Sequence, residues 1–154
     1  MNYSTIKKQA ALLIESTDNL ISDLSNVAAL LFNSLEDVSW AGFYIYSNAK
    51  LLLGPFIGKP ACTQIEVGKG VCGTAFANKE TVVVKNVHEF SGHIACDSAS
   101  NSEIVVPIFA NNKVVGVLDL DSTSLNRFTE VYKIGLEEIV EVVSRSFLKE
   151  QFKL

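Results

Sequence analysis

Apolar positions in the first 35 residues recur at the spacing of two amphipathic helices. They form two series, Tyr3, Ile6, Ala10 and Leu13, then Leu20, Leu24, Val27, Leu31 and Leu35. A spacing of three and four residues places each series on one face of a helix. Asp18 lies just before the second series and is the expected N-cap of the second helix.

From residue 40 the pattern changes to the two-residue alternation of β-strands. In WAGFYIY, alternation places Trp40, Gly42 and Tyr44 on one face of a strand and Ala41, Phe43 and Ile45 on the other. KLLLGPF predicts a second strand that ends at Gly54 and Pro55. Shorter strands are expected in ACTQIEV and TVVVKNV, with a short helix in TAFANK between them.

Two confidently patterned strands, EIVVPIF and KVVGVLDLD, follow and are joined at residues 110–112. The last element is an amphipathic helix, with Tyr132, Leu136, Ile139, Val140, Val143 and Phe147 on its apolar side. This order predicts an α+β fold, an α/β sandwich whose mostly antiparallel central sheet of five to six strands carries N-terminal and C-terminal helices. Residues 1–154 contain no internal repeat or linker, so a single domain is expected.

Composition narrows the functions to consider. The net charge is −4, from 17 acidic and 13 basic residues, and the basic residues are scattered, so nucleic-acid binding is not expected. No apolar run approaches the roughly 18 residues that a membrane span needs. The first residues lack the features of a secretory signal, which predicts a cytoplasmic, reducing environment.

Three cysteines in a reducing compartment do not predict a disulfide framework. Cys96 lies in a stretch, residues 86–101, that has no apolar periodicity and collects Asn, His, Ser, Gly and Asp. A loop of that length inside a domain is usually functional. Because structural cysteines are normally surrounded by apolar residues, Cys96 is a candidate for chemistry.

Two alternative sites have weaker support. GKGVCG at 68–73 matches the dinucleotide-binding fingerprint, but the helix after it is short and the following strands look antiparallel, so the nucleotide interpretation is rejected. Its glycines instead predict a sharp turn and a close backbone approach. A zinc site built from Cys62, Cys72, Cys96, His88 and His93 stays open, although no two of these cysteines have the close spacing of structural zinc sites.

The strand GVLDLDS carries Asp119 and Asp121 on one face among apolar neighbours. Two carboxylates in such a strand predict a polar pocket in which burial and mutual repulsion raise their pKa values. Glu103, which opens the preceding strand, joins them only if the register allows it. A two-residue turn at 111–112 places Glu103 on the wrong face, whereas a longer loop or a bulge near Pro107 brings it opposite an aspartate.

Taken together, GPFIGKPAC, GKGVCGTA, NVHEFSGHIACDSASNSEIVVP and GVLDLDS resemble the free methionine-(R)-sulfoxide reductases, which are single GAF-domain enzymes. The motifs span Trp40 to Ser122, and the outer helices add a general GAF-like outline. The resemblance implies thiol-dependent reduction of free methionine-(R)-sulfoxide. It also implies that Glu103 lies with the aspartates, and therefore predicts the loop or bulge.

The resemblance further implies a role for each motif residue. Cys96 is the expected nucleophile, and Cys62 and Cys72 are expected to be resolving or recycling thiols, in an order left open. Glu103, Asp119 and Asp121 line the substrate site, and Trp40 and Tyr44 form a wall for the substrate methyl group. Backbone N–H groups around Ile94, Ala95 and Cys96 are candidates to hold the substrate carboxylate.

Residue chemistry agrees with this implied reaction. A thiolate attacks the sulfoxide sulfur, a protonated carboxyl donates to its oxygen, and a carboxylate binds the substrate ammonium. The resulting sulfenic acid condenses with a second thiol to give a disulfide, which thioredoxin or another external dithiol reduces. No bound cofactor or metal is expected, and a homodimer through the terminal helices is. The alternative function is a GAF module that senses a small molecule without chemistry.

Overall fold

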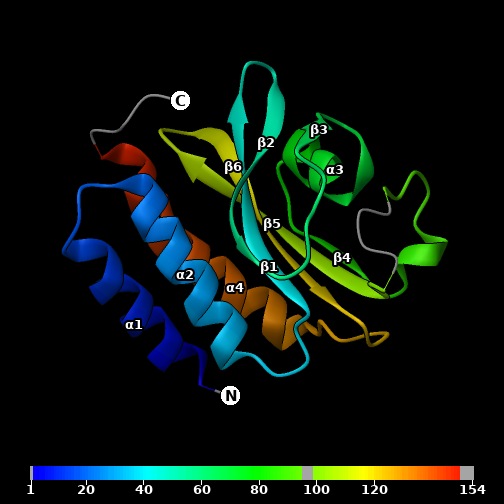
Figure 1. The fold of residues 1–154 in the computed structure, drawn as a ribbon, viewed down its shortest axis with the longest axis horizontal. Helices are drawn as coiled ribbons and strands as arrows, with labels where there is room; N and C mark the ends of the chain where they lie inside the picture. Colours follow the sequence, from blue (N-terminus) through cyan, green and yellow to red (C-terminus); the bar gives the residue numbers. More distant parts are fainter. Residues whose placement is uncertain (1, 95–98, 150–154) are drawn as a thin grey trace.

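Six strands form one sheet in the computed structural model, which describes residues 2–94 and 99–149 (Figure 1). The strands are β1 Trp40–Ser47, β2 Lys50–Ile57, β3 Gln64–Glu66, β4 Val82–Val84, β5 Ser102–Ala110 and β6 Lys113–Ser122. Their order is β3-β2-β1-β6-β5-β4, and every neighbouring pair is antiparallel. The central pair, β1 and β6, therefore joins segments about 75 residues apart in the chain.

The helices are divided between the two faces of the sheet. Their bounds are α1 Tyr3–Glu15, α2 Leu20–Ser34, α3 Gly70–Asn78 and α4 Glu130–Val143, with 3₁₀ turns at Val87–Glu89 and Ser144–Leu148. In Figure 1, α1, α2 and α4 lie together on one face and α3 lies on the other. This arrangement confirms the predicted α+β fold with terminal helices packed on an antiparallel sheet.

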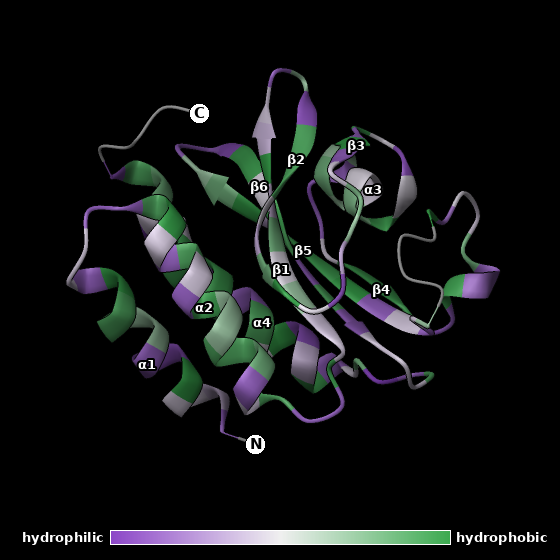
Figure 2. Cartoon of the chain, viewed as in Figure 1, coloured by the Kyte–Doolittle hydropathy of each residue, from purple (hydrophilic) through white to green (hydrophobic). Residues whose placement is uncertain are grey.

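Alternation along the strands separates two apolar clusters. Ala41, Phe43 and Ile45 of β1 pack into the larger cluster, beneath α1, α2 and α4. Trp40 and Tyr44 belong to a smaller cluster on the α3 side, as the alternation predicted. Figure 2 shows hydrophobic and hydrophilic stretches along α1, α2 and α4, as amphipathic helices require. Within the described residues, every helix is too short or too polar to cross a membrane.

The predicted N-cap of α2 is wrong by one residue. Asn19, not Asp18, has the extended backbone of a cap, and its side chain accepts a hydrogen bond from the Ser22 N–H at 3.0 Å. A cap must reach the backbone N–H two or three residues into the helix, and Asn19 stands at that distance.

The predicted end of β2 is also wrong, because the strand continues through Gly54 and Pro55 to Ile57. Gly42 pairs with Phe56, but Tyr44 pairs with Leu53, so one residue of β1 faces two of β2. This is a β-bulge, and a bulge is one of the few places in a sheet that accept a proline.

At the C-terminal end, α4 stops at Val143 and continues as the 3₁₀ turn that contains Phe147. Phe147 still packs against the larger apolar cluster, so its predicted contact with the core is retained. The tighter turn changes the geometry of the segment without moving its apolar side away from the sheet.

Candidate active site

The sheet face beneath α3 carries the polar side chains that the sequence pattern singled out. Trp40 pairs with Asp121, and Asp121 pairs in turn with Glu103, across the adjacent strands β1, β6 and β5. Side chains alternate along a strand, so Tyr44 and Asp119 project from the same face as these three. All five side chains line one pocket.

A β-bulge sets this register. The turn at 111–112 has two residues, which alone would place Glu103 on the opposite face from the aspartates. The register shifts by one residue between Ile108 and Phe109, and Glu103 lies opposite Asp121. The predicted bulge is therefore confirmed, and it occurs together with the two-residue turn.

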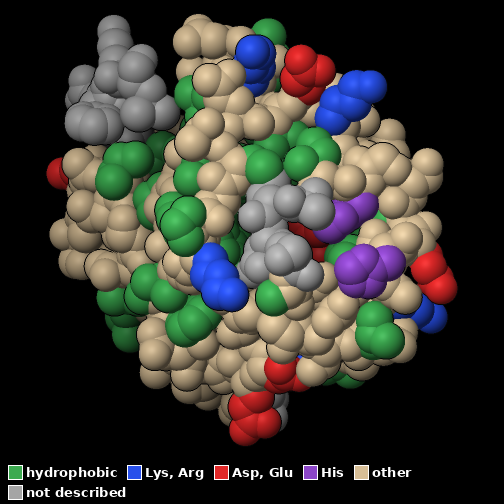
Figure 3. All heavy atoms as spheres, turned by 45° about the vertical axis from the view of Figure 1, so that its right-hand side comes forward, with side chains coloured by type: hydrophobic (Ala, Val, Ile, Leu, Met, Phe, Trp, Pro, Cys, Tyr) green, Lys and Arg blue, Asp and Glu red, His purple; other side chains and the backbone are tan. Residues whose placement is uncertain are grey.

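The pocket lies between this sheet face, α3, β3 with the segment before it, and the segment before β5. It is lined by Trp40, Tyr44, Pro60, Ala61, Ile65, Gly70, Val71, Cys72, His93, Ile94, Ser100, Glu103, Asp119 and Asp121. Figure 3 shows acidic side-chain atoms at the bottom of a hollow in the surface, next to the histidine side chains. Apolar walls around a few convergent polar groups are typical of a small-molecule site.

Burial shapes the chemistry of the carboxyl groups. Glu103 and Asp119 are each 6% exposed. Burial, followed by the charge of Asp121, raises the pKa of Glu103 to about 8. Burial and the charge of Glu103 also raise the pKa of Asp119 well above its usual range. Both groups can therefore hold a proton near neutral pH and donate it to a ligand oxygen.

Cys72 on α3 lies directly against this cluster. Its Sγ donates a hydrogen bond to Oδ2 of Asp119 at 3.4 Å, and the side chain is buried. Burial, and then the nearby charges of Asp119 and Glu103, raise the pKa of the Cys72 thiol. A thiol held neutral in this way is a poor nucleophile, and its S–H can act as a weak hydrogen-bond donor.

Cys62 is placed differently, in the segment before β3, where it is half-buried. It is disulfide-bonded, whereas Cys72 carries a free thiol. Tyr44 Oη donates a hydrogen bond to the backbone carbonyl of Cys62 at 2.8 Å. Trp40 Nε1 donates to the carbonyl of Lys59 at 3.0 Å. The two aromatic residues thus fix the backbone around Cys62, next to Pro60 and Ala61 of the pocket lining.

Trp40 and Tyr44 also form a stacked aromatic wall. Their ring centroids are 6.2 Å apart, and Trp40 stacks on Phe56 at 5.2 Å. Gly42 between them makes this possible, because a Cβ there would lie 2.3 Å from the Phe56 Cβ and 2.7 Å from the Trp40 ring. The wall therefore depends on a residue without a side chain.

The loop that contains Cys96 borders the pocket through the residues described on either side. His93 and Ile94 line it, and Nε2 of His93 is 3.7 Å from Oε2 of Glu103. Burial lowers the pKa of His93, which favours a neutral imidazole there. Ala95 and Cys96 lie outside the described residues, so the predictions made for them stay predictions.

Ser100, which the sequence did not single out, closes the other side of this loop. It is 4% exposed, and its hydroxyl has no hydrogen-bond partner among the described residues. The signal that could have indicated Ser100 is its position within the long aperiodic stretch at 86–101. Ser100 is a further polar group available to a ligand.

The glycine-rich segment at 68–73 makes a sharp turn and allows two backbone segments to approach closely. Gly70, which begins α3, has φ of 62°, and a Cβ at Gly73 would lie 2.4 Å from the Glu66 carbonyl oxygen. The strands before and after α3 are β3 and β4, which lie at opposite edges of the sheet. The parallel βαβ unit of a dinucleotide site is absent from these described strands, in agreement with the rejected nucleotide interpretation.

The histidines and cysteines of the zinc hypothesis do not all converge. His88 is exposed, its Nε2 contacts Oδ1 of Asn101 at 2.9 Å, and it is not among the residues that line the pocket. Among the described residues, the group with the proximity of metal ligands is instead Cys72, Glu103 and Asp119, whose ligand atoms lie within 4.8 Å of one another.

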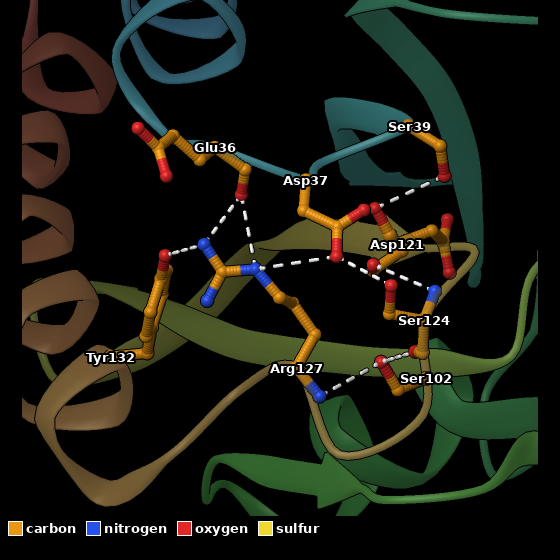
Figure 4. A network of polar contacts seen from close by, with 9 residues as sticks. Glu36, Asp37, Ser39, Ser102, Asp121, Ser124, Arg127 and Tyr132 are labelled. Carbon is orange, nitrogen blue, oxygen red and sulfur yellow. Dashed lines mark hydrogen bonds and ion pairs between the residues drawn. The ribbon is translucent and has the colours of Figure 1, made fainter.

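A polar network supports the end of β6 that carries Asp121 (Figure 4). The backbone carbonyl of Asp121 accepts hydrogen bonds from Ser39, through its N–H at 2.8 Å and its hydroxyl at 3.2 Å. Nearby, Arg127 donates to the Glu36 carbonyl and lies over the Tyr132 ring at 4.4 Å from its centroid. The carboxylate-bearing strand end is therefore fixed to the segment between α2 and β1.

Comparison with known proteins agrees with this site. The GAF domain family matches residues 22–146. The free methionine-R-sulfoxide reductase of Escherichia coli (strain K12) is 43% identical over 98% of this chain and 92% of that protein. The structure of fRMsr of Staphylococcus aureus in its reduced form is 51% identical over 94% of both chains, with a TM-score of 0.91. Free methionine-R-sulfoxide reductase from Neisseria meningitidis, solved in complex with its substrate, is 38% identical over 95% of this chain and 88% of that chain, with a TM-score of 0.92.

These similarities cover the motifs and almost the whole chain, well beyond a shared fold. The chain belongs to the GAF domain family and, within it, to the free methionine-R-sulfoxide reductases.

Proposed function

We propose that the protein reduces free L-methionine-(R)-sulfoxide to L-methionine, with Cys96 as the nucleophile. The observation that carries the proposal is the buried pair Glu103 and Asp119 facing an aromatic wall, in a chain of this family. Acid groups kept protonated by burial are suited to a sulfoxide oxygen, which needs a proton before it can leave sulfur.

Substrate binding uses three parts of the pocket. The methyl group of the sulfoxide packs against Trp40 and Tyr44, whose rings are stacked. Asp121, the half-buried carboxylate nearer the surface, binds the ammonium group. Backbone N–H groups from Ile94 to Cys96 bind the substrate carboxylate, which selects the free amino acid because a residue inside a peptide has neither charged group.

The chemistry begins at the sulfoxide sulfur. The Cys96 thiolate attacks this sulfur, and Glu103 or Asp119 donates a proton to the sulfoxide oxygen. The oxygen is transferred to the cysteine, which becomes a sulfenic acid as methionine leaves. The thiol of a second cysteine then attacks the sulfenic sulfur, so that water leaves and a disulfide forms.

Cys62 is the second cysteine in this proposal. Of the two cysteines that the structure describes, Cys62 is disulfide-bonded and Cys72 carries a free thiol. The hydrogen bond from Cys72 to Asp119 gives Cys72 a separate task, which is to orient the acid.

Turnover requires an external dithiol to reduce this disulfide, and thioredoxin in the cytoplasm is the proposed reductant. Cys62 is half-buried and therefore within reach of a second protein's thiolate, whereas Cys72 is buried. No resident cofactor takes part in the proposed cycle.

A homodimer is also part of the proposal. Leu12 of α1 and Val131 and Ile134 of α4 are apolar and 54% to 67% exposed, on helices that pack against each other. Large apolar side chains exposed to this degree on the terminal helices favour self-association. Sedimentation velocity of the wild type and of Ile134→Lys tests it, since a monomeric wild type would contradict it.

The deciding experiment measures turnover of free L-methionine-(R)-sulfoxide with dithiothreitol, beside the S epimer. With dithiothreitol the wild type should reduce only R, and Cys96→Ser should be inactive. With thioredoxin as the only reductant, Cys62→Ser should release one methionine per chain before stalling, because no intramolecular disulfide forms for thioredoxin to reduce. Cys72→Ser is the matched control, because a hydroxyl can replace the hydrogen bond to Asp119. If reduced wild-type protein leaves both epimers untouched, the protein is a small-molecule sensor and not this enzyme.

A further inference from the structure

Three buried groups of the pocket meet from three different elements: Cys72 from α3, Glu103 from β5 and Asp119 from β6. One ligand atom of each lies within 4.8 Å of the other two. The proposed reaction uses the carboxyls as acids and the thiol as a hydrogen-bond donor, and the same three groups also have the proximity of metal ligands.

The spacing agrees with tetrahedral metal coordination. With zinc–sulfur and zinc–oxygen bonds of about 2.3 and 2.0 Å, a sulfur and an oxygen ligand stand about 3.5 Å apart. Sγ of Cys72 and Oδ2 of Asp119 are 3.4 Å apart. A cation can therefore be held by small side-chain movements within a site that is already assembled.

An independent observation also points to a ligand. Asp119 is 6% exposed, and its Oδ1 has no hydrogen-bond partner among the described residues. A buried carboxyl oxygen without a partner is costly, and a cation or a polar ligand removes that cost.

We propose that Cys72, Glu103 and Asp119 form an inhibitory site for Zn²⁺ or a similar borderline divalent cation. A thiolate ligand favours zinc over magnesium or calcium, which prefer all-oxygen sites with more ligands. Three protein ligands leave the fourth tetrahedral position for water, as in open zinc sites.

The inhibitory part of this inference rests on the proposed function. Glu103 and Asp119 cannot coordinate a cation and donate a proton to a sulfoxide at the same time, so cation and substrate compete. Inhibition should be reversed by a chelator and overcome by raising the substrate concentration. The binding part depends only on the three side chains.

The binding test uses Co²⁺ as a spectroscopic probe and the full chain carrying Cys62→Ser and Cys96→Ser. Cys72 is then the one remaining thiol. We expect one Co²⁺ per chain, a sulfur-to-cobalt charge-transfer band in the near ultraviolet, and loss of the band when Zn²⁺ is added. Zn²⁺ should also raise the Tm of this variant, because it binds the folded state.

Two further variants on the same background act as controls. Cys72→Ser should abolish the band, and Glu103→Gln should weaken Zn²⁺ binding by about tenfold or more. Thermal unfolding without metal confirms that each variant is folded. Absence of the charge-transfer band in the folded Cys62→Ser/Cys96→Ser protein, or its persistence after Cys72→Ser, would overturn the inference.

The outcomes also separate this inference from the proposed function. If the protein turns over the R epimer but binds no Co²⁺, the proposed function stands and the metal site is overturned. If it binds Co²⁺ through Cys72 but reduces no sulfoxide, the metal site stands and the proposed function is overturned.

Discussion

Glu103 of β5 lies directly opposite Asp121 of β6, and Asp119 lies two residues away on the same strand face. Glu103 is buried, whereas Asp121 is half-buried at the strand end. The charge of Asp121 therefore adds to burial in raising the pKa of Glu103 to about 8. When two facing carboxyl groups differ in burial, the more buried one can stay protonated and act as a proton donor, and the less buried one can stay ionised and bind a positive charge.

The first prediction concerns the pH dependence of turnover. Glu103 is protonated below about pH 8 and loses its proton above it, so kcat/KM should fall on the alkaline side with an apparent pKa near 8. Glu103→Gln should lower kcat by roughly 10²-fold to 10⁴-fold, because an amide cannot supply a proton. Steady-state rates between pH 6 and 10 check both statements. An unchanged kcat in Glu103→Gln would remove Glu103 from the reaction.

The second prediction tests the origin of that pKa. Asp121→Asn removes the negative charge that raises the pKa of Glu103, so the alkaline limb of kcat/KM should move to lower pH. KM should also rise, because the substrate ammonium loses its partner. Glu66→Gln is the matched control, since this exposed carboxylate on β3 is outside the pocket lining. If the alkaline limb of kcat/KM stays at the same pH in Asp121→Asn, burial alone sets the pKa of Glu103.

The third prediction links the same group to stability. Glu103 has a pKa of about 8 in the folded protein, against an ordinary value of 4.5. Between these values the native state holds a proton that the unfolded state has released, so the free energy of unfolding falls as pH rises from about 4.5 to 8. Glu103→Gln should flatten this slope and be about 1 to 3 kcal/mol more stable than wild type at pH 8. Urea unfolding at pH 5 and pH 8 measures it. If Glu103→Gln and the wild type are equally stable at pH 8, burial of the Glu103 carboxyl does not lower the stability of the folded protein at that pH.

The fourth prediction separates the two halves of the proposed cycle. Tyr44→Phe keeps the ring against the substrate but removes the hydrogen bond to the Cys62 carbonyl, which contributes about 1 kcal/mol. Release of the first methionine should stay near the wild-type rate, and formation of the disulfide should slow several-fold. Rapid-quench measurement of methionine beside thiol titration resolves the two steps. If methionine release slows and thiol loss does not, the hydroxyl acts on the substrate and not on the Cys62 segment.

Local patterns predicted much of this architecture. Alternation from Trp40 to Ile45 assigned each side chain to the correct sheet face, because strand alternation depends only on the local backbone. The same alternation identified the two carboxylates of β6, because they are polar residues on one face of an otherwise apolar strand. The spacing of three and four residues between apolar side chains likewise located α1, α2 and α4.

Apart from the N-cap of α2, which is a local contact, the features that were missed depend on partners far along the chain. Gly54 and Pro55 look like a strand end, yet pairing with β1 accommodates them in a bulge. The register of Glu103 was undecided by pattern alone, because one inserted residue near the β5–β6 turn reverses its face. Sequence spacing also could not place Cys72 against Asp119, since α3 and β6 meet only through the folded sheet.

The fifth prediction concerns the contact that ties the C-terminal segment to the first two helices. Lys149 Nζ lies 2.7 Å from Oδ2 of the fully buried Asp23 and donates to the Thr17 carbonyl at 2.6 Å. Ser146 donates to the same Asp23 oxygen at 2.8 Å. Removing the lysine leaves a buried carboxylate without its cation, which typically costs about 3 to 5 kcal/mol.

Lys149→Met should therefore lower the free energy of unfolding by about 3 kcal/mol, while kcat at low temperature stays close to wild type, because Lys149 is outside the pocket lining. Lys8→Met on the exposed side of α1 removes a positive charge of the same kind and should change stability by less than about 0.5 kcal/mol. Urea unfolding of both variants gives the comparison. Equal stabilities of the two variants would mean that the hydroxyls of Ser146 and Thr17, which both donate to Asp23, satisfy this carboxylate without the lysine.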